Sequence, residues 1–173
     1  MGIDQVNGIP AHALLVHATV VLVPLACALT IGSALWPALR NRLGIITPLM
    51  AFVAMVMVPV TTEAGEWLAR RMRNTPLIEK HVEIADNLLP WVVGVFAVAV
   101  VQWGYYRFGL PASVGRGSRK PTQNVPAMVL LALLAVVTAA GSVVEIYRIG
   151  DSGAKAVWTG NFSDKPVQNP ALQ

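Results

Sequence analysis

Three histidines are the side chains of this 173-residue chain best suited to chemistry, and carboxylates lie near them in the sequence. His12 and His17 are five residues apart, and His81 lies between Glu79 and Glu83. Imidazole ligates transition metals and haem iron, and it titrates nearest to neutral pH. Carboxylates can complete a metal shell or hold an imidazole in one tautomer. These residue types therefore indicate a metal site, a haem site or a proton-handling site.

His17 is the most informative of the three. It lies five residues further into an apolar segment than His12, about 7.5 Å deeper at ~1.5 Å per helical residue. Ionisable groups at such depth generally face the protein interior and have a function. We therefore expect His17 and His81 to ligate a b-type haem or a metal ion. The alternative is a neutral His17 that only hydrogen-bonds a neighbouring helix.

Two carboxylates could complete a metal site. Glu63 and Glu66 are three residues apart and share one helix face. If a metal ion is bound in place of haem, the expected ligands are His17, His81, Glu66 and Glu63. His12 is a weaker candidate, because five helical steps rotate it by about 140° from His17. The secondary candidates are His12, Glu83, Asp86 and Glu145.

Glu145 has an alternative role, since Arg148 is three residues further on and can form an ion pair with it. The sequence contains no HExxH, Walker A or GxGxxG motif, and no CxxCH for covalent haem. The single cysteine, Cys27, cannot form an internal disulfide. Without a catalytic motif, we expect a protein that is not an enzyme on its own.

Four apolar segments must position these side chains, at about residues 13–36, 45–62, 88–106 and 125–146. Each is near the ~20 residues that cross a ~30 Å hydrocarbon core, and a backbone in lipid satisfies its own hydrogen bonds as a helix. Only 13% of the residues are charged, against about 25% in a soluble domain. The sequence therefore predicts an all-α integral membrane protein with four transmembrane helices in an up-down bundle.

The connecting segments predict the orientation. We expect residues 1–150 to form the transmembrane domain, with the second helix extended to about residue 73. Residues 151–173 are expected to form an extracytoplasmic polar tail, with at most a short interfacial turn at 154–158. The segments 37–44 and 107–124 carry six basic and no acidic residues, so they are expected in the cytoplasm. All three histidines then share the extracytoplasmic end.

The positive charge and the small residues bear on partners. The net charge of +4 flanks the apolar segments, which indicates lipid headgroups rather than nucleic acid. The small residues at 139–142 allow a close helix approach, either inside the bundle or to a partner or second copy.

Four motifs, taken in order, resemble a bacterial membrane family, domain-of-unknown-function family 2231. They are residues 12–17 (HALLVH), 61–67 (TTEAGEW), 81–91 (HVEIADNLLPW) and 148–158 (RIGDSGAKAVW). The family commonly has Pro after the first His and Phe-Pro after the second, where this chain has Ala13 and Ala18-Thr19. The resemblance implies a four-helix protein of the bacterial inner membrane. Because some relatives are fused to Rieske-type or cytochrome-like domains, it also implies a partner in electron transfer.

Three functions follow as hypotheses. The first is a membrane protein that holds haem b or a metal ion near the extracytoplasmic face and serves electron transfer with a membrane redox partner. The alternative is a cofactor-free structural or assembly subunit of a membrane complex. The third is a transporter or proton-handling protein.

Overall fold

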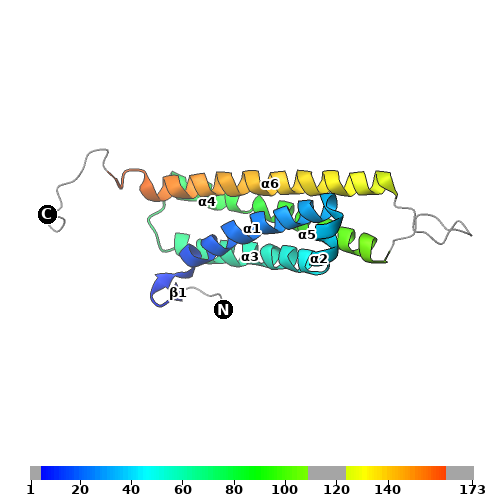
Figure 1. The fold of residues 1–173 in the computed structure, drawn as a ribbon. Coiled ribbons are helices and arrows are strands. Elements are labelled where there is room, and N and C mark those ends of the chain that lie inside the picture. The colour runs from blue at the N-terminus through cyan, green and yellow to red at the C-terminus, as the bar shows by residue number, and fades with distance from the viewer. Residues whose placement is uncertain (1–4, 109–123, 163–173) are drawn as a thin grey trace, which may run out of the picture.

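The computed structural model describes residues 5–108 and 124–162. A short β-hairpin leads into a bundle of long helices (Figure 1). The elements are β1 (Gln5–Val6), β2 (Ile9–Pro10), α1 (Ala11–Leu35), α2 (Pro37–Leu43), α3 (Ile46–Ala69), α4 (Pro76–Ala85), α5 (Leu88–Phe108) and α6 (Val125–Trp158).

Four helical segments are long and apolar enough to cross a membrane. They are Ala11–Leu35, Ile46–Ala69, Pro76–Phe108 (which joins α4 and α5) and Val125–Trp158. The four apolar segments of the sequence correspond to them, but three are longer in the structure. The second ends at Ala69 rather than near residue 62, the third begins at Pro76 rather than near residue 88, and the last ends at Trp158 rather than near residue 146. The all-α membrane class predicted from the sequence is therefore confirmed.

Small side chains form the core, and large apolar side chains face outward. Ala26, Ala51, Ala54 and Ala99 are completely buried, whereas many valines and leucines are exposed. Lipid tails are as apolar as leucine, so close packing of small residues holds membrane helices together better than bulk apolar area does. This distribution fits a bundle surrounded by lipid.

The small residues of α6 are used inside the bundle. The ring of Trp91 lies so close to Gly141 that a Cβ at this position would overlap it. Ala139 and Ser142 are also buried. The sequence left open whether residues 139–142 allow a close helix approach inside the bundle or to a partner. The structure shows a close approach inside the bundle.

The last helix is longer than the sequence predicts. α6 continues to Trp158, so residues 151–158, expected as tail, are helical. Gly150 and Gly153 lie inside α6 and do not end it. Lys155 Nζ lies 2.7 Å from Asp151 Oδ2, and Ser152 Oγ donates to the carbonyl oxygen of Ile149 at 2.8 Å. The rest of the expected tail, residues 163–173, lies outside the described residues.

Two connections also differ from expectation. Residues 37–43 form α2, which begins with Pro37 in the first turn, where its missing N–H costs nothing. α3 ends at Ala69 rather than near residue 73, and α4 begins after Thr75. The Thr75 hydroxyl accepts a hydrogen bond from the Ile78 amide at 3.3 Å, as an N-cap does.

The bundle has two chemically different ends (Figure 1). The histidine end comprises the start of α1, the end of α3, α4 and the last turns of α6. The α2 end comprises the end of α1, α2, the start of α3 and the end of α5. The histidines lie at the first end, and Arg40, Arg42 and Arg107 lie at the second.

Candidate functional site

Two histidines from different helices meet at the histidine end. His12 in α1 and His81 in α4 have ring centroids 6.4 Å apart, with their planes at 76°. Both side chains are half-buried. The two residues are far apart in sequence, so it is the fold that builds this pair.

The hydrogen bond of His12 fixes its tautomer. Its Nδ1 lies 3.0 Å from the carbonyl oxygen of Thr61 in α3. A carbonyl oxygen can only accept, so Nδ1 carries the proton and a neutral ring keeps a free lone pair on Nε2. This is the arrangement found in histidines that bind a metal through Nε2.

Thr61 also ties α3 to α1 through its hydroxyl. Its Oγ1 donates to the Met57 carbonyl oxygen at 2.7 Å, so the Thr19 hydroxyl, also at 2.7 Å, must donate to Thr61. Thr19 and Thr61 are both buried. The carbonyl that orients His12 therefore belongs to a residue held in place from two sides.

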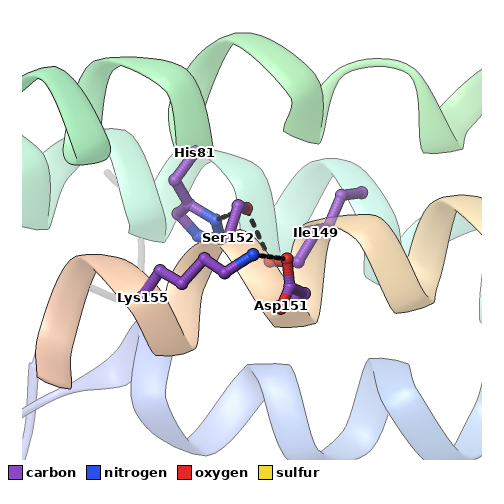
Figure 2. A network of polar contacts seen from close by, with 5 residues as sticks. All are labelled: His81, Ile149, Asp151, Ser152 and Lys155. Atoms are coloured by element: carbon purple, nitrogen blue, oxygen red, sulfur yellow. Dashed lines mark hydrogen bonds and ion pairs between the residues drawn. The ribbon is translucent and has the colours of Figure 1, made fainter. Parts of the chain in front are cut away.

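His81 reaches the same tautomer through a serine (Figure 2). Its Nδ1 lies 2.8 Å from Ser152 Oγ, and that hydroxyl gives its only proton to the Ile149 carbonyl oxygen, also at 2.8 Å. Ser152 can therefore only accept from His81. Nδ1 of His81 carries the proton, and its Nε2 lone pair is free.

A glycine lies against each imidazole ring. A Cβ at Gly65 in α3 would come within 2.8 Å of His12 Cε1, and a Cβ at Gly153 in α6 within 2.9 Å of His81 Cε1. Such separations are too short for carbon atoms, so any side chain there would displace the ring. The two glycines keep room for the histidines between the helices.

The structure does not bring His17 to His81. His17 is exposed, and its Nδ1 bonds the carbonyl oxygen of Ala13 in its own helix at 2.6 Å. The expectation that His17 faces the bundle interior is therefore wrong. Because α1 is apolar all round, the sequence pattern does not indicate which side of the helix faces the bundle.

The structure also does not group the expected carboxylate ligands with the histidines. Glu66 pairs with Arg70 at 3.3 Å. Glu63, Glu83 and Asp86 are exposed. Within residues 5–108 and 124–162, no three His, Cys, Asp or Glu side chains are grouped closely enough to hold a metal ion.

Glu145 forms an ion pair with Arg148, which was its alternative role in the sequence analysis. Its Oε1 lies 2.8 Å from Arg148 Nη1, and the glutamate is only 8% exposed. Its Oε2 is buried and has no hydrogen-bond partner among the described residues. A partly compensated carboxylate therefore lies inside the bundle, two helical turns from Ser152 along α6.

Sequence reasoning missed the supports of the histidines. Thr61, Gly65, Ser152 and Gly153 were not selected as site residues, although all four lie in the motifs at 61–67 and 148–158. A glycine in each motif was the available signal, since a glycine within a helical segment often has a packing reason.

Comparison with known proteins agrees with the membrane architecture. The chain belongs to a family described as predicted membrane protein (DUF2231), whose model matches residues 8–166. That range includes all four motifs and both histidines of the pair. No curated protein and no solved structure matches the chain.

Proposed function

We propose that this member of the DUF2231 family is a membrane electron-transfer protein in which His12 and His81 would hold a b-type haem. The observation that carries the proposal is the tautomer of the pair. Each ring donates its Nδ1 proton to an oxygen held by the fold and keeps Nε2 free to bind iron.

The number of ligands favours haem over a bare metal ion. A structural metal site takes about four protein ligands, whereas a haem iron needs only one or two, because the porphyrin supplies the rest. His12 and His81 are two. A transition metal bound by this pair with water or a partner's residue is the second form of the same proposal.

The ring separation supports the same choice. Imidazoles on opposite sides of one ion, with metal–nitrogen distances of about 2.0 Å, have ring centres about 6.3 Å apart, and at a tetrahedral angle about 5 Å apart. The His12 and His81 centroids are 6.4 Å apart. A separation of this size is compatible with two imidazoles that bind one iron.

Bound haem would supply one-electron transfer. The chain's own part is to orient and tune the ligands. Donation from Nδ1 to the Thr61 carbonyl makes His12 a more basic ligand, which favours the oxidised iron. The Ser152 hydroxyl does the same for His81 more weakly. Gly65 and Gly153 exclude side chains from the space beside the rings.

We further propose that the protein lies in the bacterial cytoplasmic membrane with the histidine end outside. The basic residues of the α2 end support this orientation through the positive-inside rule. The site would then exchange electrons with a partner at the extracytoplasmic face.

Absorption spectra of the detergent-purified protein, oxidised and then reduced with dithionite, test the proposal together with elemental analysis. We expect a Soret band that shifts on reduction and one iron per chain. His12→Ala and His81→Ala should each remove the band, and His17→Ala is the matched control that should keep it. Added imidazole should restore part of the band in His12→Gly.

Other outcomes separate the alternatives. A colourless protein with stoichiometric metal that both variants lose would replace haem by a metal ion. Loss of cofactor in His17→Ala but not in His12→Ala would overturn the assignment of the pair. A protein with neither haem nor metal, co-purifying with a stoichiometric membrane partner, would favour the cofactor-free assembly subunit.

A further inference from the structure

A second polar site lies at the α2 end, opposite the histidines. It is a cavity of about 140 Å³ between the end of α1, α2, the start of α3 and the end of α5. Its lining includes Arg40, Thr47, Gln102, Trp103, Tyr106 and Arg107. A cavity of about 150 Å³ holds one benzene molecule, so there is room for one small polar group.

Arg40 is fixed in this cavity before any ligand arrives. Its Nε donates to the Ser33 carbonyl oxygen at 2.8 Å and its Nη2 to the Ala34 carbonyl oxygen at 3.0 Å. Its guanidinium lies 3.4 Å from the ring centroid of Tyr106. A guanidinium has five N–H donors, so Arg40 keeps free donors after two of them bond the carbonyl oxygens at the end of α1.

In the part of the chain that the structure describes, no carboxylate pairs with the arginines of this end. Among the described residues, no ion pair involves Arg40 or Arg107. The acidic residues of α3, α4 and α6 lie towards the histidine end, and the sequence of residues 109–123 contains no Asp or Glu. This end is therefore suited to an anion from outside the chain.

Two polar atoms beside the arginine lack partners. The Tyr106 hydroxyl and Gln102 Oε1 are buried without a hydrogen bond among the described residues, and Gln102 is only 2% exposed. The hydroxyl can donate to an anion, whereas the amide oxygen needs a donor. A phosphate group that carries a hydroxylated substituent offers both.

The geometry points to a binding site for a phosphate group at the α2 end, and we propose that the headgroup of an anionic, hydroxyl-bearing phospholipid supplies it. Trp103 and Tyr106 lie near the end of α5, at the level where aromatic residues meet the headgroups. Basic pockets between transmembrane helices recognise anionic headgroups in this way. Arg40 and the Tyr106 hydroxyl would contact the phosphate, and Gln102 would accept from the headgroup hydroxyl.

Titration of delipidated protein with short-chain lipids tests this site. Native mass spectrometry and the unfolding temperature would follow the binding of phosphatidylglycerol, phosphatidylcholine and inorganic phosphate. We expect phosphatidylglycerol to bind and to raise the unfolding temperature, and phosphatidylcholine to do neither. Binding of inorganic phosphate with the affinity of the lipid would identify free phosphate as the source of the same group.

Three variants locate the binding. Arg40→Gln should raise the dissociation constant about tenfold, as expected for a lost charge-assisted hydrogen bond. Tyr106→Phe keeps the ring beneath Arg40 and should raise it about threefold or more. Arg42→Gln is the matched control, because Arg42 is exposed on the same helix and does not line the cavity.

Two results would overturn the proposal. One is equal binding of phosphatidylglycerol and phosphatidylcholine to the wild type. The other is an Arg42→Gln effect as large as that of Arg40→Gln, which would mean diffuse surface charge. If Arg40→Gln does not fold, the comparison of Tyr106→Phe with the wild type decides, since only a hydroxyl differs. Neither result depends on whether the protein binds haem, so this test is independent of the proposed function.

Discussion

At the scale of single residues, the candidate site depends on atoms that donate or accept in only one way. The Thr61 carbonyl cannot donate, and the Ser152 hydroxyl has already given its proton to Ile149. Both histidines are therefore held with Nδ1 protonated. A Ser152→Ala variant would keep the shape of the site and remove the acceptor of His81.

If the protein binds haem as proposed, we expect Ser152→Ala to retain it and to raise its reduction potential, because His81 would become a less basic ligand. Spectroelectrochemical titration of the variant and the wild type measures this shift. Ser142→Ala is the control, since Ser142 is also a buried serine of α6, donates to the Thr138 carbonyl oxygen and lies ten residues from Ser152. An unchanged potential in Ser152→Ala would mean that the hydroxyl does not tune the site.

The glycines of α6 give a matched pair of substitutions. A Cβ at Gly153 would meet His81 Cε1 at 2.9 Å, whereas a Cβ at Gly150 would meet nothing within 4 Å. We expect Gly153→Ala to destabilise the fold by about 1–3 kcal/mol and to lower cofactor content. Gly150→Ala should stabilise it by about 0.5–1 kcal/mol, because alanine is the better helix former. Thermal unfolding in detergent measures both, and equal effects would contradict the close contact at Gly153.

At the scale of elements, α4 is the helix that carries His81 to the bundle, and its start depends on Thr75. We expect Thr75→Ala to cost about 1 kcal/mol and to loosen the first turn of α4, since the Ile78 amide would lose its acceptor. Hydrogen exchange of the α4 amides should rise while that of α5 stays unchanged. Thr75→Ser retains the acceptor and should behave as the wild type, and a serine variant as unstable as the alanine one would exclude capping as the cause.

The sequence predicted best those elements whose composition is set by contact with lipid. The four membrane segments could be predicted because each needs about 20 apolar residues. The short helix α4 and the last turns of α6 were missed, because they lie where water or tertiary contacts, not lipid, decide the structure.

The choice between His12 and His17 failed for a related reason. In α1 apolar residues surround the helix, so the pattern fixes the angle between the two histidines but not which one faces α3 and α4.

At the scale of the whole molecule, the two ends of the bundle differ in charge. Charges of both signs lie towards the histidine end, where they form the ion pairs Glu66–Arg70, Glu145–Arg148 and Asp151–Lys155. The α2 end carries Arg40, Arg42 and Arg107, and among the described residues no ion pair involves them. The positive-inside rule counts basic residues in short connections, and it is the basis on which we propose that the α2 end faces the cytoplasm.

This orientation predicts opposite labelling of two cysteines. Ala38 in α2 and Asn161 after α6 are exposed at opposite ends, and the native Cys27 is only 3% exposed and would be replaced by alanine. In intact cells, a membrane-impermeant maleimide should label Asn161→Cys and spare Ala38→Cys. Permeabilisation should expose Ala38→Cys without changing the first signal. The reverse pattern would place the histidine pair on the cytoplasmic side, where its electron partner would have to be a cytoplasmic protein.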